Sequence, residues 1–165
     1  MPLYFAYGSN MDVEAMRRRC PRSRPIGLAR LERHRLAIMH EGWLTVVRSP
    51  RSAVHGVLWE LALADVPALD RYEGLRAGLY AKVVQPVIGP GGAKRAIVYV
   101  GANAGPGAPS ADYIAGVLAA ARAAGLPARA IAALEALRPL RPAVRAAPAN
   151  GRPVLRSEVH GLARK

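Results

Sequence analysis

The sequence predicts a single domain of the α+β class, built on a mixed, mostly antiparallel sheet that curls or closes into a small β-barrel with flanking helices. Three observations lead to this class. Short apolar segments of strand character recur between turn residues along the chain. Most connections between them are too short for βαβ crossovers, which favours antiparallel pairing. Helical segments are inserted between some strands and gathered toward the end, as in a mixed architecture.

The first half of the chain is expected to contain one helix and five strands. An apolar strand over residues 2–6 ends in a tight turn. A helix then covers 12–19, with Asn10 or Asp12 able to cap its N-terminus. Four further strands are expected at 26–31, 35–39, 43–47 and 54–61. The dipeptide Ser49-Pro50 is expected to separate the last two.

The second half is expected to contain three helices and two more strands, which brings the sheet to six or seven strands. A short helix over 64–72 runs into Glu73-Gly74, where glycine permits the chain to reverse. Strands at 79–87 and 95–100 are expected to form a hairpin around a glycine-rich turn. After a loop, an Ala-rich helix covers 110–124 and a second helix ends near residue 137.

Residues 1–138 are expected to form the folded domain, followed by a C-terminal tail over 139–165. The tail has several prolines and many charges, so we expect it to be loosely packed. The alternative is that residues 154–159 dock on the domain as an edge strand.

The net charge of +13 is the most conspicuous bulk property of the chain. Nucleic-acid-binding proteins usually cluster their basic residues and interleave aromatic ones, whereas here the arginines are spread out and only 5% of residues are aromatic. The densest run, 17–24, lies at the end of the first helix, where cations complement the helix dipole. We therefore expect a solvated basic surface and no specific nucleic-acid partner. A role in binding polyanions or acidic substrates is the alternative.

Cysteine usage and the N-terminal sequence both favour a cytoplasmic location. The single cysteine, Cys20, has no partner for an internal disulfide and is expected to be an inert thiol. The N-terminus lacks the pattern of a signal peptide, and no apolar run reaches the roughly 20 residues of a membrane span. We expect no membrane partner, and the sequence does not indicate an oligomeric state.

The histidines and glycines do not follow the spacing of a metal or nucleotide site. The four histidines lack the paired spacing of zinc ligands, and no glycine-rich phosphate loop is present. We therefore expect no metal and no cofactor. His55 lies within an apolar strand, which favours a structural role over a catalytic one.

Residues 4–11, Tyr-Phe-Ala-Tyr-Gly-Ser-Asn-Met, join the first strand to the first helix. Gly8 lets a ligand approach the backbone, and the N–H groups that follow can bind a carboxylate or an oxyanion. Spacing alone favours the alternative, a polar turn that only caps the helix.

A second segment with chemical potential surrounds Glu73. This residue follows a helix, precedes a strand, and has the apolar and aromatic neighbours Tyr72, Leu75 and Tyr80. An apolar setting raises a carboxyl pKa toward neutrality, as an acid–base group requires. A surface glutamate paired with Arg71 or Arg76 is the alternative.

Taken in order, these segments resemble the gamma-glutamylcyclotransferase-like (AIG2-like) family. The shared pattern is an N-terminal strand ending in Tyr-Gly-Ser-Asn, followed by a Glu-Gly step shortly before a Gly-x-Tyr strand. The resemblance extends to Val-His-Gly-Val-Leu-Trp at 54–59, and to 109–113 and 124–127 near the closing helices. It covers about residues 3 to 137.

The resemblance implies that residues 1–138 are a catalytic domain with Glu73 as the catalytic acid and base. The implied reaction is attack of a substrate's α-amine on its own γ-glutamyl carbonyl, which releases 5-oxoproline and a free amine. The substrate-binding residues it implies are Tyr4, Phe5, Ala6, Tyr7, Gly8, Ser9, Asn10, Tyr80 and Tyr113.

Two alternatives to this activity remain open. The same fold can act on a γ-glutamylamine isopeptide or on a γ-glutamyl protecting group used in biosynthesis. It can also serve as a noncatalytic basic binding module, because a fold does not determine a function. The sequence does not identify the leaving amine.

Overall fold

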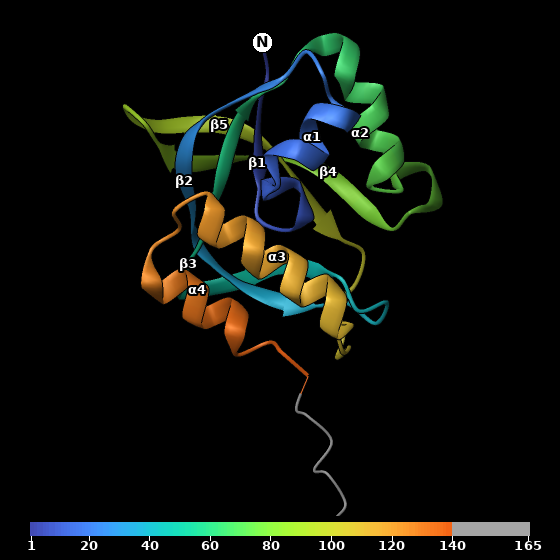
Figure 1. Ribbon diagram of the computed structural model, residues 1–165, viewed down its shortest axis with the longest axis vertical. Coiled ribbons are helices and arrows are strands. Elements are labelled where there is room, and N and C mark those ends of the chain that lie inside the picture. Colours follow the sequence, from blue (N-terminus) through green and yellow to red (C-terminus); the bar gives the residue numbers. More distant parts are fainter. Residues whose placement is uncertain (140–165) are drawn as a thin grey trace, which may run out of the picture.

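Five strands close into a barrel in the computed structural model, which describes residues 1–139 (Figure 1). Around the barrel they follow the order β1-β3-β2-β4-β5. Their bounds are β1 (Leu3–Ala6), β2 (Arg24–Ile38), β3 (Leu44–Glu60), β4 (Tyr80–Gly89) and β5 (Gly92–Gly101). Neighbouring strands are antiparallel except β1 and β5, which run parallel. The predicted α+β class and mostly antiparallel barrel are therefore confirmed.

The helices lie in two groups on the barrel. Figure 1 shows α1 and α2 together toward one end, and α3 with α4 toward the other. The α-helices are α1 (Val13–Arg19), α2 (Val66–Tyr72), α3 (Ala111–Ala123) and α4 (Ala128–Glu135). Single 3-10 turns are η1 (Ser9–Met11), η2 (Leu63–Asp65) and η3 (Leu75–Ala77).

The prediction of six or seven strands was wrong for the described residues, because two pairs of predicted segments are continuous strands. The long strands β2 and β3 pair along their whole length, from Arg24 opposite Glu60 to Ile38 opposite Leu44. The pairing is interrupted only by irregularities, of which the larger lies between Glu32 and His34. The hairpin bends there without ending.

Ser49-Pro50, the predicted break, lies in β3 opposite that irregularity. The paired residues change from Glu32 with Ala53 to His34 with Arg48, so residues 49–52 have no regular partners on β2. Proline is tolerated at such a bulge because its missing N–H costs no ladder hydrogen bond. On the opposite strand Arg33 has a φ of 59°, which absorbs part of the bend.

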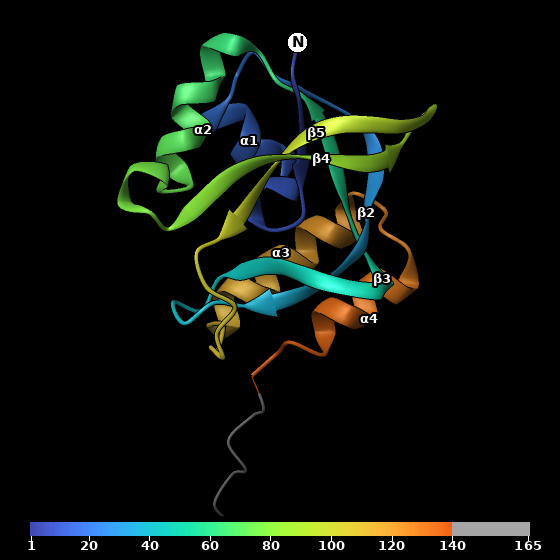
Figure 2. The same ribbon diagram turned by 180° about the vertical axis from the view of Figure 1, so that it is seen from behind.

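One hydrophobic core joins the barrel interior to the helices. Trp59, Phe5 and Leu58 are completely buried in this core, and Ile114 and Leu118 bring α3 onto the same cluster. Figure 2 shows from behind how α3 and α4 lie beside the lower halves of β2 and β3. This packing leaves the β1–α1 connection between the barrel and α3.

Side-chain caps define where two helices begin. Asp12 accepts hydrogen bonds from the backbone N–H groups of Glu14 and Ala15, so it is Asp12 and not Asn10 that caps α1. Ser110 accepts one from the N–H of Tyr113 and caps α3. Asn10 is therefore free for another role.

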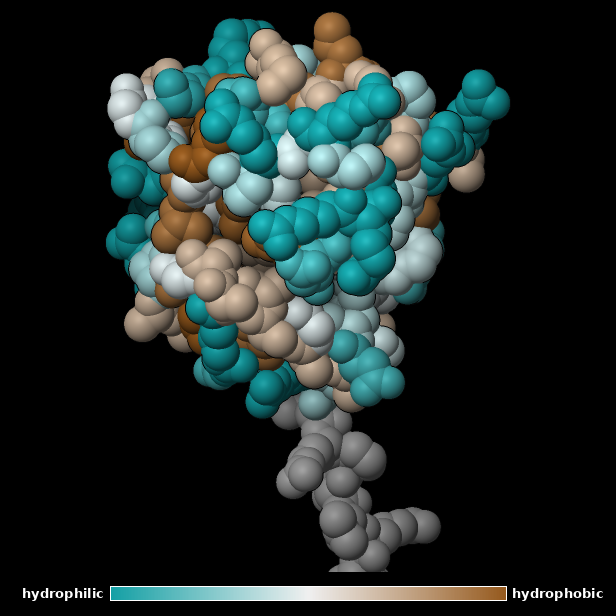
Figure 3. Space-filling model, turned by 45° about the horizontal axis from the view of Figure 1, so that its top comes forward, coloured by the Kyte–Doolittle hydropathy of each residue, from teal (hydrophilic) through white to brown (hydrophobic). Residues whose placement is uncertain are grey.

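Hydrophilic side chains do not form an unbroken surface on the face shown in Figure 3. In that view the end of the molecule at the top of Figure 1 comes forward, and neutral and apolar side chains interrupt the hydrophilic ones. Several arginines of the described residues pair with carboxylates, including Arg17 with Glu14 and Arg24 with Glu60. The arginine run is thus partly neutralised locally.

Among residues 1–139, no helix has the length and apolar character needed to cross a membrane. The predicted tail lies outside the described residues, apart from its first residue.

Candidate active site

A small cavity of about 40 Å³ lies between the β1–α1 connection, the end of α2 and the start of α3. Its lining comes from six separate parts of the chain and is dominated by tyrosine. The lining residues are Tyr4, Tyr7, Gly8, Ser9, Asn10, Leu44, Glu73, Tyr80, Tyr99 and Tyr113. Glu73 is the only carboxylate among them.

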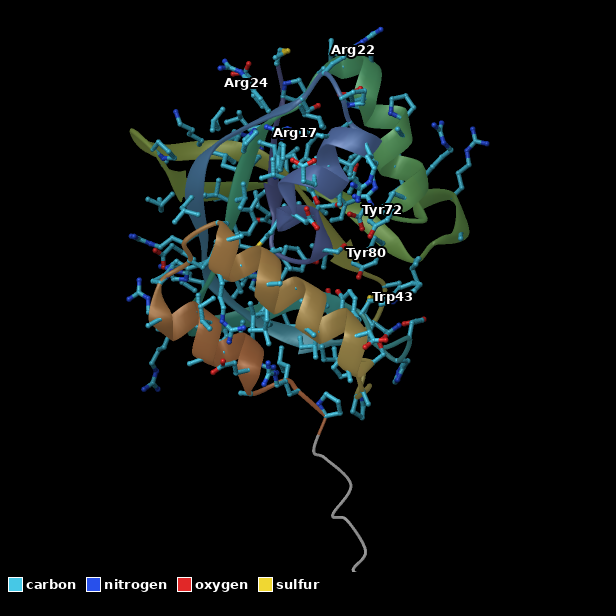
Figure 4. All side chains as sticks on the ribbon, in the orientation of Figure 1. Arg17, Arg22, Arg24, Trp43, Tyr72 and Tyr80 are labelled. Atoms are coloured by element: carbon cyan, nitrogen blue, oxygen red, sulfur yellow. The ribbon has the colours of Figure 1, made fainter. Side chains whose placement is uncertain are left out.

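The cavity continues outward into an aromatic mouth of about 210 Å³. Ser9, Tyr80 and Tyr113 line both spaces, and Trp43, Tyr72 and Leu79 line the mouth alone. Figure 4 shows Tyr72, Tyr80 and Trp43 one below another along the side between α2 and the start of α3. Trp43 is 42% exposed and Tyr72 is 46% exposed, so this apolar surface is open to solvent.

Local backbone geometry holds Glu73 at the cavity. Glu73 is the C-terminal cap of α2, and the next residue, Gly74, has a φ of 64°, a left-handed conformation that favours glycine. The chain therefore turns away from the axis of α2 directly after Glu73. The Oε1 atom of Glu73 accepts a hydrogen bond of 2.8 Å from Nδ2 of Asn10, 63 positions earlier.

The pKa of Glu73 lies near neutrality. Burial raises it from an ordinary carboxyl value to about 7, against the lowering effects of the Arg19 charge and of hydrogen bonds with Tyr4 and Asn10. A carboxyl with this pKa is present in both protonation states at neutral pH. It can accept and return a proton within one reaction cycle.

Asn10 connects Glu73 to its surroundings. Its amide nitrogen donates to the Tyr4 hydroxyl at 3.0 Å as well as to Glu73, and its amide oxygen accepts from Arg19. The side chain is 2% exposed, and both ends of its amide are engaged. Asn10 therefore holds the Glu73 carboxyl in one orientation.

Arg19 does not belong to a fully solvated helix face, contrary to the prediction for this arginine run. Its guanidinium carbon lies 3.3 Å from the ring centroid of Tyr72, and its charge acts on Glu73. Arg17 and Arg18, one turn or less away, are exposed as expected. The difference arises because α2 packs beside the end of α1, which brings Tyr72 over Arg19.

Three tyrosine hydroxyls at the cavity are committed to protein acceptors. Tyr7 donates to the Tyr99 carbonyl at 2.5 Å, Tyr80 donates to the Leu44 carbonyl at 2.7 Å, and Tyr99 donates to the Asp70 carboxylate. Burial raises the pKa of each of these phenols above its ordinary value, so they stay protonated. They rigidify the cavity wall.

The hydroxyl of Tyr113 differs from these three. It accepts a hydrogen bond of 3.1 Å from the N–H of Leu44, so its own proton is available to a ligand. Burial raises the Tyr113 pKa to about 12, which keeps that proton in place. Gly8 lies beside it: a Cβ at Gly8 would be 3.6 Å from the hydroxyl oxygen. The missing side chain at Gly8 keeps this part of the cavity open.

Most of the sequence-predicted site residues come together at this cavity. Glu73, Tyr80, Tyr113 and five of the seven residues in 4–10 line it. Phe5 and Ala6 do not. Both are completely buried against β3, where Phe5 Cε2 and the Ala6 carbonyl lie close to the backbone of Gly56.

Sequence reasoning missed three residues. Tyr99 and Leu44 line the cavity from strands with no motif, and Arg19 was grouped with its exposed neighbours. The only available signal was for Tyr99, a single aromatic hydroxyl in the otherwise apolar run 96–100. In residues 1–139 no three His, Cys, Asp or Glu side chains gather as metal ligands would.

These features define a class of small β-barrel proteins with a single buried carboxyl, of near-neutral pKa, in a tyrosine-lined cavity. Residues 53–134 match the model of the AIG2-like family. Human gamma-glutamylcyclotransferase is 30% identical over 148 residues, which cover 83% of this chain and 79% of the human protein. The chain belongs to the gamma-glutamylcyclotransferase family, as its sequence motifs predicted.

Two further comparisons agree with this membership. The bovine gamma-glutamylcyclotransferase is 33% identical over 91 residues, a match that spans 49% of this chain and about half, 48%, of the bovine protein. A solved structure of a gamma-glutamyl cyclotransferase superimposes with a TM-score of 0.78 at 26% identity, covering 89% of this chain and 94% of that one.

Proposed function

We propose that this protein is a gamma-glutamyl cyclotransferase, which converts a γ-glutamyl amide into 5-oxoproline and a free amine, with Glu73 as the catalytic acid and base. Family membership supports the reaction class. The observation that carries the proposal is the pKa of Glu73, about 7, in a cavity with no other carboxylate. A group of this kind is what an internal proton transfer requires.

The proton balance of the reaction explains why one carboxyl is enough. The substrate's α-nitrogen enters as an ammonium ion and ends as the lactam N–H, while the leaving nitrogen enters as an amide and ends as an ammonium ion. Two protons therefore pass from one nitrogen to the other, and none is gained or lost overall. Glu73 can carry them in turn, taking each proton as a base and returning it as an acid.

The remaining requirement is that the protein hold the substrate in a reactive conformation. Attack by the α-amine closes a five-membered ring, so nucleophile and electrophile are already in one molecule and need only be held folded back. The cavity next to Glu73 holds about 40 Å³, which suits the reacting atoms and not a whole substrate. The Tyr113 hydroxyl, with its free proton, is available to the carbonyl oxygen as negative charge develops there.

The leaving amine is expected to lie in the aromatic mouth. Trp43, Tyr72 and Leu79 give that space an apolar wall. Such a wall favours an amine with an alkyl or aromatic body over a small polar one. This feature supports the alternative substrate, a γ-glutamyl isopeptide in which the amine is a lysine side chain.

A panel of γ-glutamyl amides tests the proposal. We expect at least one amino-acid, lysine-isopeptide or alkylamine adduct to give 5-oxoproline and free amine, measured by mass spectrometry. Acylation of the α-amine should stop conversion, and α-linked glutamyl dipeptides should not react. Release of free glutamate would identify a hydrolase, and a panel without any reaction would favour a noncatalytic binding protein.

A further inference from the structure

A second and larger cleft lies at the bend of the β2–β3 hairpin, where α4 packs beside β3 (Figure 2). Its volume is about 760 Å³, within the roughly 300–1,000 Å³ typical of small-molecule sites. The cleft and the Glu73 cavity have only Tyr7 in common. The two sites therefore have almost entirely different linings.

The floor of this cleft is aliphatic. It is formed by side chains from both strands of the hairpin, from the α3–α4 connection and from α4, most of them buried. These residues are Leu36, Val54, Leu126, Ala130 and Leu134. Four of the five are at most 8% exposed and Leu36 is partly exposed, so an apolar ligand gains about 25 cal/mol per Å² only over the limited area that they leave open to water.

The rim carries an excess of positive charge. Arg30, Arg35, Arg51 and Arg129 line the cleft and are exposed, whereas Glu32 is the only acidic residue that lines it. Glu32 pairs with Arg30. Within residues 1–139, no carboxylate forms an ion pair with the other three, so their charges are available to a bound anion.

His55 lies next to two of these arginines, and its pKa responds to their charge. Its Nε2 atom is 3.2 Å from Nη2 of Arg129, and Arg30 is its partner across the strand pair. A guanidinium only donates, so Nε2 must accept and the imidazole is neutral in this contact. Burial, then the charges of Arg129 and Arg30, lower the His55 pKa, while Glu32 opposes them.

We propose that this cleft binds an amphiphilic anion, a single alkyl chain with a carboxylate or phosphate head. The chain covers the aliphatic floor, and the head pairs with Arg129 and with Arg51 or Arg35. Neither part of such a ligand is sufficient alone, because the floor has no polar groups to offer and the rim arginines are individually exposed to water.

The same features argue against two other occupants. A nucleic acid would use the arginines but would leave the aliphatic floor uncovered, and the lining includes only one aromatic residue, Tyr7, for base stacking. The chain's own residues 140–165 contain five arginines and one lysine against a single glutamate, so their charge repels the rim.

Binding to the full-length protein tests the proposal. Decyl phosphate and decanoate, used below their micellar concentrations, should bind in calorimetric titrations. Inorganic phosphate has only the anionic head, and decanol has only the alkyl chain. Each should therefore bind at least about tenfold more weakly than decyl phosphate, a difference of about 1.4 kcal/mol in binding free energy. Decyltrimethylammonium has the same chain with the opposite charge and should not bind measurably.

Two variants and a matched control locate the site. Arg129→Ala and Arg51→Ala should each weaken decyl phosphate binding about three- to tenfold, as expected for a partly exposed charged contact. Arg95→Ala, an exposed arginine of β5 outside the cleft, should change nothing. Circular dichroism melts verify that each variant is folded.

Proton NMR of His55 gives an independent reading. A bound anion offsets the charges of Arg129 and Arg30, so decyl phosphate should raise the His55 pKa, and decanol should not. Equal affinity for decanol and decyl phosphate, unchanged binding in Arg129→Ala, or binding without a His55 shift would each overturn the proposal.

Discussion

Glu73 is subject to opposing influences that leave its pKa near neutrality. Removal from water raises the pKa, and Arg19, Tyr4 and Asn10 restrain the rise by stabilising the charged form. Because the pKa of Glu73 is about 7, both its protonated and its charged form are well populated at neutral pH. The residue-scale predictions follow from this balance.

Replacement of Glu73 by glutamine removes proton exchange and preserves size. We expect turnover to fall by at least ~10²-fold, the lower range for a lost acid–base group. Retention of most of the activity would remove Glu73 from the mechanism.

Stability should respond to the same substitution in a pH-dependent way. Because the folded-state pKa of Glu73 is raised to about 7, its ionisation costs stability as pH rises from its ordinary value toward 7. Glu73→Gln should therefore melt like the parent at acidic pH and at an equal or higher temperature at pH 8. A large loss of thermal stability at both pH values would indicate a structural role instead.

Arg19 is predicted to act as a positioning residue through Asn10 and through its charge. Arg19→Ala should raise the Glu73 pKa further, so the rise of kcat/KM with pH should move to more alkaline pH. The matched control is Arg18→Ala, an exposed neighbour on α1, which should leave the profile in place. Identical profiles for both variants would exclude the proposed role.

At the scale of elements, the pairing of β1 with β3 positions the loop that carries Tyr7 to Asn10. The register places Ala6 opposite Val57, and the chain turns into η1 directly after this pair. Gly56 permits the close approach, since a Cβ there would lie 2.1 Å from the Ala6 carbonyl oxygen. The position of this loop thus depends on a glycine that does not itself line the cavity.

Gly56→Ala should therefore destabilise the fold by about 1–3 kcal/mol or more, the typical cost of overpacking a core. Urea unfolding measures this change in the free energy of unfolding. In the control, Gly116→Ala on α3, the new Cβ meets nothing within 4 Å, and helix propensity predicts a gain of up to ~1 kcal/mol. Equal effects of the two substitutions would contradict the steric explanation.

The β2–β3 hairpin shows where element-level sequence reasoning succeeds and fails. Apolar segments at 26–31, 35–39, 43–47 and 54–61 were all correctly assigned to strands. Their continuity was missed, because charged residues and Ser49-Pro50 interrupt the apolar pattern. In the folded chain those residues lie at a bend, where strand pairing continues on either side without them.

At the scale of the whole molecule, the strands, the candidate active site and the second cleft all lie within residues 3–134. The AIG2-like match also ends at residue 134. We therefore expect that deletion of residues 145–165 preserves the fold and the Glu73-dependent reaction. Circular dichroism and 5-oxoproline release measure both, and insoluble or inactive protein would show that the deleted residues contribute to the domain.

Short-range patterns in the sequence determined most of the local structure and the position of the Glu73 carboxyl. Apolar periodicity indicated the strands. Asp12 and Ser110 cap the N-termini of α1 and α3, and the Glu-Gly step ends α2 with Glu73 as its last cap residue. The two motifs also predicted most of the cavity wall. Each of these features depends on residues a few positions apart, which a sequence displays directly.

Only the tertiary structure decided how these pieces act together. Asn10 reaches Glu73 across 63 positions, Arg19 reaches Tyr72 from another helix, and Tyr99 joins the cavity from a strand without a motif. The pKa of Glu73 depends on how completely these distant groups exclude water and where they place their charges. Solvent exclusion and Coulomb interactions are set by distances in space, and a linear sequence does not record them.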